Sequence, residues 1–334
     1  MVGLLRELGK TGVKLNPLGL GCMGMCDGVY GAADDEESLR VLNRALELGC
    51  TFWDTADMYG VGQNETFLSE MVKKNRDKVF ICTKFGNVRD PETGTFLRVD
   101  GTPEYVRKAC DASLKRLGID TIDLYYQHRV DKNTPIEETV KAMAELVKEG
   151  KVRYLGLSEC SADTLRRAYK IHPIAAVQIE YSPWYLGIEK NGLLAAAREL
   201  GVTIVAYSPL GRGFLTGVIK SLDDLPPDDY RRHAPRFFPE NFQKNLDLVK
   251  RIEELAKKKG VTPSEYVLAW VLAQGEDFFV IPGTKKVRYL EKNVNGGQLE
   301  LTKEEEAEMR TAIDAAAPKG DRYAAHFMSA VEDR

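Results

Sequence analysis

The 334-residue sequence has little that would set it apart from an ordinary globular protein. It has no apolar run near the roughly 18 residues that span a bilayer, and its charged N-terminus, MVGLLRELGKTG, has no apolar core of the kind found in signal peptides. It has no basic excess either, because 47 Lys and Arg face 50 Asp and Glu. That balance gives no electrostatic footprint for nucleic acid. We therefore expect a cytoplasmic protein without membrane or nucleic-acid partners.

Cysteine is sparse and scattered. None of the six cysteines belongs to a CxxC pair with a matching partner pair, so no disulfide framework is indicated and no metal is expected. Four of them lie inside apolar stretches, where cysteine behaves as a small hydrophobic residue. Cys22 and Cys26 stand in a glycine-rich segment and are expected to be partly exposed. The thiols are expected to be reduced and structural.

The sequence does contain eight short runs rich in β-branched and aromatic residues, each followed by an amphipathic stretch. The runs are Pro17–Met23, Thr51–Ala56, Val79–Phe85, Ile122–His128, Val152–Ser158, Ala175–Tyr181, Thr203–Ser208 and Phe278–Pro282. Apolar strands that alternate with helices are typical of a parallel sheet covered by helices. Eight strands close a barrel. The pattern predicts a single α/β domain over residues 1–334, a (β/α)8 TIM barrel, with an open doubly wound sheet as the main alternative.

Capping residues mark several helices between these runs. The predicted helices are Glu36–Leu48 after Asp34 or Asp35, Tyr105–Leu117 between Thr102-Pro103 and Gly118, Val140–Lys148 between Thr134-Pro135 and Gly150, one starting at Ser161, and Ile188–Leu200 before Gly201.

Three segments lie outside the repeat. Arg6–Leu8 and Val13–Leu15 predict an N-terminal β-hairpin that plugs the bottom of the barrel. Gly211–Asn241, rich in proline, predicts a long functional loop after strand seven. Thr302–Ala316 predicts a C-terminal helix, followed from Pro318 by a tail that we expect to be poorly ordered.

Polar side chains end three successive strands, where the active site of such a barrel lies. Asp54 and Tyr59 follow strand two, Lys84 ends strand three and His128 ends strand four. Each residue alone is compatible with an ordinary turn, packing or surface role. Together, at one mouth, they predict a catalytic site.

The chemistry of this set favours proton transfer to a substrate oxygen. Lys84 is tolerated in a partly buried site if Asp54 pairs with it. We expect its charge to lower the pKa of Tyr59, so that the phenol donates a proton to a developing alkoxide. His128 would hydrogen-bond and orient the same oxygen. Because no side chain donates hydride, a redox reaction here requires a cofactor.

Later strand ends suit a dinucleotide. The segment Gly19–Gly24 lacks the helix and acidic residue of a Rossmann fingerprint. Ser158-Glu159 and Gln178 suit a carboxamide, and Tyr207 can stack on a flat ring. Ser208–Gly213 is a small-residue turn that can approach a pyrophosphate. Gly283–Arg288, with three cations at the start of a helix, suits a phosphate, although a solvated basic helix end is the alternative.

These residues lie in motifs that resemble the aldo-keto reductase superfamily from about Leu4 to Asn295. The motifs are LGLGCMGM, FWDTADMYG, CTKFG, DLYYQHR, VRYLGLSE, AAVQIEYS, VAYSPLGRGFLTG and IPGTKKVRYLEKN. The QHRVD and GLSEC segments resemble the branch of perakine reductase and the pyridoxal reductases. The resemblance implies NADPH-dependent reduction of an aldehyde or ketone to an alcohol, with Asp54, Tyr59, Lys84 and His128 as the catalytic tetrad and Tyr59 as the proton donor.

The resemblance also implies cofactor and substrate residues. The cofactor set is Gly21, Cys22, Met23, Asp54, Ser158, Gln178, Tyr207, Ser208, Leu210, Arg212, Gly283, Thr284, Lys285, Lys286, Tyr289 and Asn293. The substrate pocket is expected to include Met23, Tyr30, Phe85, Arg129, Trp184, Phe237 and Phe238. Glu159 and Lys292 depart from many relatives, which have Asn and an acidic residue at these positions. The extra cation at 292 is consistent with NADPH rather than NADH.

Two other functions fit parts of the pattern. One is an NADPH-binding sensor or auxiliary subunit with little turnover, which the complete tetrad disfavours. The other is a barrel aldolase in which Lys84 forms a Schiff base, which the adjacent Tyr59 and the stacking Tyr207 disfavour. The remaining partner is expected to be a small-molecule carbonyl substrate, and the protein itself a monomer or a weak homo-oligomer.

Overall fold

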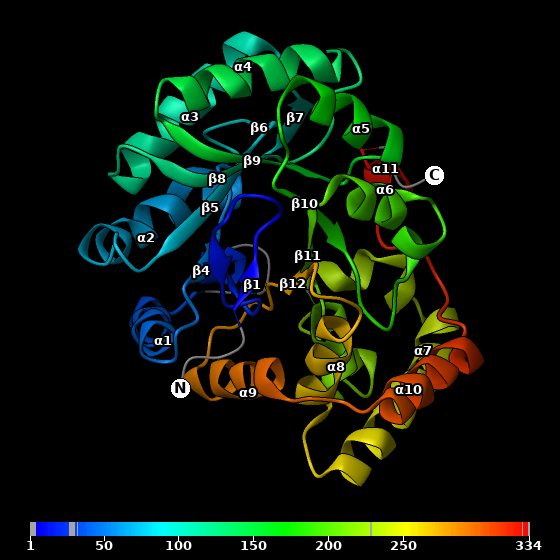
Figure 1. The fold of residues 1–334 in the computed structure, drawn as a ribbon. Coiled ribbons are helices and arrows are strands. Elements are labelled where there is room, and N and C mark those ends of the chain that lie inside the picture. The colour runs from blue at the N-terminus through cyan, green and yellow to red at the C-terminus, as the bar shows by residue number, and fades with distance from the viewer. Residues whose placement is uncertain (1–4, 27–30, 32, 228, 329, 333–334) are drawn as a thin grey trace.

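The computed structural model describes residues 5–26, 31, 33–227, 229–328 and 330–332. Within these residues, eight parallel strands follow one another around a barrel in chain order (Figure 1). They are β3 (Leu20–Gly21), β4 (Phe52–Asp54), β5 (Phe80–Phe85), β8 (Ile122–Gln127), β9 (Val152–Ser158), β10 (Ala176–Glu180), β11 (Thr203–Tyr207) and β12 (Phe278–Val280). Parallel bridges from Leu18 to Val280 and from Gly21 to Gly283 join the last strand to the first. The barrel is closed, which excludes the open sheet.

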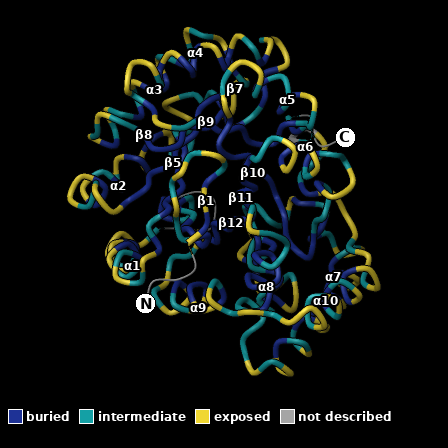
Figure 2. The backbone as a smooth tube through the Cα atoms, in the orientation of Figure 1, coloured by how far each residue is buried: buried dark blue, intermediate teal, exposed yellow. Residues whose placement is uncertain are grey.

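Helices cover the outside of the barrel (Figure 1), and Figure 2 shows their exposed outer faces around the buried strands. The helices are α1 (Asp35–Glu47), α2 (Gln63–Lys74), α3 (Pro103–Leu117), α4 (Ile136–Lys148), α5 (Ala162–Ile171), α6 (Leu193–Leu200), α7 (Pro239–Lys259), α8 (Pro263–Leu272), α9 (Val287–Gln298), α10 (Lys303–Ala316) and α11 (Ala325–Met328). In α8 every residue from Tyr266 to Leu272 is buried, because α8 packs between β12 and the outer helix α7. No helix of the described ranges is long and apolar enough to cross a membrane.

Most of the predicted helix starts are confirmed by side-chain caps. Asp34 caps α1, Thr102 caps α3 with Pro103 at the first position, and Ser161 caps α5. The prediction that Thr134-Pro135 repeats the arrangement of α3 is wrong. Pro135 itself occupies the cap position of α4, and the Thr134 hydroxyl donates instead to Asp131. The structure also differs at α6, which begins at Leu193 rather than Ile188 because Gly192 has a left-handed backbone.

The barrel interior changes from apolar to polar along the strand direction. Inward side chains near the strand starts, among them Phe52, Phe80, Leu124, Ala176 and Val205, pack into one apolar cluster. Successive inward positions lie two residues apart on a strand. Moving two residues on from Phe52, Cys82, Tyr126, Ala176 and Val205 therefore gives Asp54, Lys84, His128, Gln178 and Tyr207. The sequence thus places a polar layer directly above an apolar one.

The segments outside the repeat follow the predictions in part. The strands β1 (Arg6–Glu7) and β2 (Lys14–Leu15) form the expected hairpin, and Leu8 between them is fully buried against the apolar cluster. The segment after β11 is irregular, as expected, but it contains short 3-10 helices and ends where α7 begins at Pro239. A second hairpin, β6 (Asn87–Arg89) with β7 (Phe96–Val99), follows β5 and was not predicted.

Candidate active site

The four residues of the predicted tetrad meet at the C-terminal mouth of the barrel. The Lys84 ammonium Nζ lies 2.5 Å from Asp54 Oδ1 and 3.3 Å from the Tyr59 hydroxyl, and donates to the backbone carbonyl of Thr55 at 2.8 Å. The Tyr59 and His128 rings are edge to face, with centroids 6.0 Å apart. Strands β4, β5 and β8 lie side by side, and this order brings the residues together.

Asp54 and Lys84 form a buried ion pair, with side chains 3% and 0% exposed. Burial raises the pKa of the Asp54 carboxyl, and the Lys84 charge opposes that rise. The pKa of Lys84 is raised overall, because the attraction of Asp54 and Tyr59 outweighs the burial of the ammonium. The second carboxylate oxygen of Asp54 accepts from Gln178 Nε2 at 2.8 Å. Both oxygens are thus satisfied, which a buried carboxylate requires.

Tyr59 is presented by a tight turn. It begins the 3-10 helix Tyr59–Gly62, in which Gly60 and Val61 both have positive φ angles, 56° and 52°. Burial raises the pKa of the Tyr59 phenol, and the charge of Lys84 lowers it by less. The expectation that Lys84 brings this pKa down is therefore wrong, because the loss of solvent outweighs the cation. Tyr59 stays protonated and can act as a proton donor.

His128 is a neutral imidazole. Burial lowers its pKa well below 6.5, and the positive charges of Arg129, Lys84 and Arg89 lower it further. The His128 backbone N–H donates to the Phe85 carbonyl at 2.7 Å, which fixes the residue beside β5. Its Nδ1 is buried and has no hydrogen-bond partner among the described residues. A neutral ring beside Tyr59 suits a polar substrate atom placed between them.

The strand ends predicted to hold a dinucleotide have unusual backbone conformations. Glu159, Ser208 and Arg212, which are not glycines, have φ angles of 54°, 49° and 58°. Such angles cost energy and are concentrated at functional sites. The Ser158 hydroxyl is buried without a hydrogen-bond partner among the described residues. An orphaned hydroxyl at this position is what a carboxamide ligand would satisfy, so Ser158 fits its predicted role.

The first and last strands approach each other closely at the other side of the mouth. A Cβ on Gly21 would lie 2.8 Å from the carbonyl oxygen of Ile281, so this contact requires glycine. The Cys22 backbone N–H donates to the Asp54 carbonyl at 2.8 Å. Cys22 and Cys26 are 0% and 5% exposed, and the expectation of partial exposure is therefore wrong. All six cysteines lie within the described residues, where they are buried and form no disulfide.

The predicted phosphate site lies at the start of α9. Lys286 occupies its cap position and Gly283 is exposed. The next backbone N–H, that of Val287, donates to Glu37 on α1 at 3.3 Å. Glu37 was not predicted here, although it belongs to the acidic run Asp34–Glu37. The predicted residues Thr284, Lys285, Lys286 and Tyr289 are exposed or half-buried, whereas Asn293 is 3% exposed.

The predicted substrate residues occupy different environments. Arg129 lies beside the tetrad and donates to the His128 carbonyl at 2.7 Å. Phe85 is fully buried and stacks on Tyr125. Trp184 is 3% exposed and packs with Phe214 and Phe237 in an aromatic cluster. Met23 and Phe238 are half-buried. Tyr30 lies outside the described residues.

The C-terminal tail, defined as the residues from Pro318 onward, reaches the same mouth. The Arg322 guanidinium forms two hydrogen bonds of 2.8 Å with Glu159, and both side chains are almost fully buried. The Tyr207 hydroxyl lies 2.7 Å from Glu159 and 2.8 Å from the Tyr323 hydroxyl. The expectation of a poorly ordered tail is therefore wrong for these residues. The polar composition of the tail gave no indication of the buried ion pair between Arg322 and Glu159.

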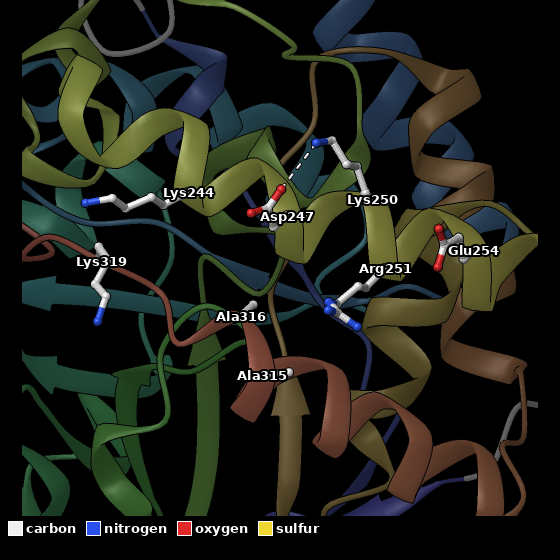
Figure 3. A pocket seen from close by; sticks show the side chains of 8 residues that line it. All are labelled: Lys244, Asp247, Lys250, Arg251, Glu254, Ala315, Ala316 and Lys319. Carbon is white, nitrogen blue, oxygen red and sulfur yellow. Dashed lines mark hydrogen bonds and ion pairs between the residues drawn. The ribbon is translucent and has the colours of Figure 1, made fainter.

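A separate groove lies in the outer layer of helices (Figure 3), between α7 and the end of α10. Its lining residues are Lys244, Asp247, Lys250, Arg251, Glu254, Ala315, Ala316 and Lys319. The residues that line this groove include no tetrad residue and no tyrosine beside a lysine, the arrangement that Lys84 and Tyr59 form at the barrel mouth. We therefore assign the chemistry to the barrel mouth. Within the described ranges, no group of three or more His, Cys, Asp or Glu residues could hold a metal.

Comparisons with known proteins agree with this geometry. The family model described as "Aldo/keto reductase family" matches residues 17–314. The chain is 51% identical over 322 residues to aldo-keto reductase yakc [NADP(+)] of Schizosaccharomyces pombe, covering 95% of this chain and 94% of that one. It is 52% identical over 328 residues to aldo-keto reductase str7 of Strobilurus tenacellus, covering 96% and 94%. Among solved structures, glycerol dehydrogenase AKR11B4 of Gluconobacter oxydans superposes with a TM-score of 0.86 at 28% identity, covering 97% and 99%.

Proposed function

The chain belongs to the aldo/keto reductase family of oxidoreductases, and from this premise we propose that it reduces an aldehyde or ketone to an alcohol with NADPH and with a proton from Tyr59. The observation that carries the proposal is the contact of Lys84 with both the Asp54 carboxylate and the Tyr59 hydroxyl at the barrel mouth. The finer resemblance to pyridoxal reductases stays a prediction, as do the substrate and the oligomeric state.

The residues at the mouth fit a nicotinamide cofactor. The buried, unpartnered Ser158 hydroxyl is available to a carboxamide, and the half-buried Tyr207 offers a ring face. When bound there, NADPH would supply the hydride that no side chain can supply. Ser208, Leu210 and Arg212 would lie along the pyrophosphate. The exposed Lys286 and Arg288 near the start of α9 would favour a 2′-phosphate over a free hydroxyl.

The tetrad residues have separate roles in moving one proton. Tyr59, with its raised pKa, holds the proton at neutral pH and donates it to the substrate oxygen as negative charge develops there. Lys84 stabilises the tyrosinate that remains, and Asp54 keeps Lys84 in place. The neutral His128 hydrogen-bonds the same substrate oxygen and orients the carbonyl.

The test is NADPH oxidation, followed by absorbance, with a panel of aldehydes, ketones and pyridoxal. We expect turnover of at least one carbonyl class and a preference for NADPH over NADH of about tenfold or more, which corresponds to about one charged contact. NADPH binding without turnover of any carbonyl would contradict the proposed reaction. Equal use of NADH would contradict the role of Lys286 and Arg288.

A further inference from the structure

The tail is attached to the barrel before it reaches the active site. Asn245 on α7 exchanges two hydrogen bonds with Lys319, of 2.8 and 2.9 Å. At Gly320, where φ is +89°, a Cβ would lie 2.8 Å from the backbone of Pro235 and Arg236. The tail therefore runs directly against the segment that follows β11. This docking fixes where the next residues, Arg322 and Tyr323, enter the molecule.

Arg322 joins the ends of two strands. Its two bonds to Glu159 hold the residue that follows β9, and its Nη1 lies 3.6 Å from Glu180 at the end of β10. Its guanidinium also lies over the Tyr185 ring, 4.4 Å from the centroid. The Arg322 side chain is 1% exposed and the Glu159 side chain 0%. Buried charges persist only when they are paired, and the two hydrogen bonds between Glu159 and Arg322 give each charge a close partner.

Glu159 connects Arg322 to Tyr207 through hydrogen bonds. One oxygen of its carboxylate accepts from the Tyr207 hydroxyl at 2.7 Å and from the Glu180 backbone N–H at 3.3 Å. The Glu159 backbone carbonyl accepts from the N–H of Glu332, further along the tail. Glu159 therefore does not lie free for a carboxamide. It links the tail to the ring on which the nicotinamide is proposed to stack.

Tyr323 touches two parts of the proposed cofactor site. Its hydroxyl lies 2.8 Å from that of Tyr207, and its ring lies under the Arg212 guanidinium, 4.7 Å from the centroid. Tyr207 is the proposed nicotinamide residue and Arg212 a proposed pyrophosphate residue. These contacts of the described tail residues lie at the ends of β9, β10 and β11 and in the segment that follows β11. Arg322 and Tyr323 thus meet the nicotinamide and pyrophosphate side of the proposed cofactor site.

We propose that the C-terminal tail is part of the cofactor site, with Arg322 as a positioning residue that sets Tyr207 through Glu159 and so tightens the nicotinamide end of NADPH. Tyr323 completes the arrangement by holding Tyr207 against Arg212. The proposal rests on the proposed use of NADPH, and it adds a residue outside the barrel repeat to the machinery of that site.

The test compares two ligands that share the adenosine end. Isothermal titration measures the Kd of NADPH and of 2′,5′-ADP, which lacks the nicotinamide, for the wild type and for Arg322→Gln. We expect the Kd of NADPH to rise about tenfold or more, as for the loss of a charge-assisted hydrogen bond, and that of 2′,5′-ADP to change less than about twofold. Arg310→Gln is the matched control, because Arg310 makes two 2.9 Å bonds to Glu189 outside the mouth. It should change neither Kd.

Three outcomes would overturn the proposal: an unchanged NADPH Kd, equal weakening of both ligands, or the same weakening in Arg310→Gln. If the wild type binds neither ligand, the proposed function itself fails. If Arg322→Gln does not fold, Tyr323→Phe takes its place, because Tyr323 is only half-buried and loses one hydroxyl. We expect a two- to tenfold rise, roughly the share of one neutral hydrogen bond, in the Kd of NADPH alone. No change there would overturn the role of the tail.

Discussion

The buried ion pair of Asp54 with Lys84 and that of Glu159 with Arg322 both lie at the mouth of this barrel, and they are built in different ways. Asp54 and Lys84 are 30 residues apart on neighbouring strands. Glu159 and Arg322 are 163 residues apart, and one of them comes from the C-terminal tail. The first pair contacts Tyr59, the proposed proton donor, whereas the second contacts Tyr207, the proposed stacking ring. The barrel repeat supplies the proposed catalytic residues, and a segment outside the repeat contacts the proposed cofactor site.

The largest expected effect is on turnover, and it tests whether the Asp54–Lys84 pair and the Glu159–Arg322 pair act on different steps. Tyr59→Phe removes the proposed proton donor beside the first pair, so we expect kcat to fall roughly 10²–10⁴-fold, the usual contribution of a general acid. The Kd of NADPH should change less than about twofold, because the Tyr59 hydroxyl contacts Lys84 and, among the described residues, forms no hydrogen bond with Ser158, Tyr207 or Tyr323. Steady-state kinetics and titration measure the two quantities.

Arg322→Gln should have the opposite effect, because it should change the Kd of NADPH more than it changes kcat. If Tyr59→Phe kept its full turnover, the tetrad assignment would fail. If both variants changed kcat and Kd in parallel, the two ion pairs would not have the separate roles that their contacts indicate.

The second prediction concerns stability. Lys84→Met leaves the Asp54 carboxylate buried without a cation, which should lower the free energy of unfolding by about 3–5 kcal/mol. In Asp54→Asn/Lys84→Met neither charge remains, so most of this loss should be recovered. Urea denaturation of the three proteins measures the difference. A double variant no more stable than Lys84→Met would show that packing of the lysine stem, rather than the unpaired charge, is responsible.

The sequence predicts the first pair and not the second for a physical reason. Strand order in a parallel barrel follows chain order, so residues that end successive strands must meet. Asp54, Lys84 and His128 could therefore be placed from their positions alone. Arg322 stands in a polar segment after the last predicted helix, where no periodicity indicates burial. Its partner Glu159 offered one signal, an acid at a strand end whose burial requires a cation.

The direction of the Tyr59 pKa could not be predicted, because the extent of burial is not readable from the sequence. The pKa of Tyr59 depends on how completely its ring is desolvated as well as on the neighbouring lysine. The aromatic residues Phe85 and Trp184 are both buried, and their place in the substrate pocket stays a prediction. At helix α4, Pro135 shifts the start by one residue relative to α3, a detail that the shared Thr-Pro dipeptide does not encode.

The third prediction tests the neutral state of His128, which faces the first pair. Burial holds its pKa below that of the unfolded chain, so the unfolded chain binds more protons as the pH falls through about 6.5. The free energy of unfolding should therefore decrease on acidification by up to ~1.4 kcal/mol per pH unit in this window. His128→Gln has no titrating group and should lose this part of the dependence. Urea denaturation at pH 7.5 and 5.5 measures it, and equal slopes for both proteins would contradict a neutral, buried imidazole.

The smallest expected effects are at helix caps, where the two sides of the barrel should not differ. Thr102 on the side of the first pair accepts from the Tyr105 N–H, and Ser161 on the side of the second accepts from the Thr164 N–H. Replacing either by Ala should lower the free energy of unfolding by about 1 kcal/mol, and Asn at either position should restore most of it. The Ser161 backbone N–H, which bonds to Glu332 of the tail, is kept in Ser161→Ala. If Ser161→Ala nevertheless cost several times more than Thr102→Ala in thermal or urea denaturation, the Ser161 hydroxyl as well as its backbone would be holding the tail, and the second ion pair would depend on the start of α5 as well as on Glu159.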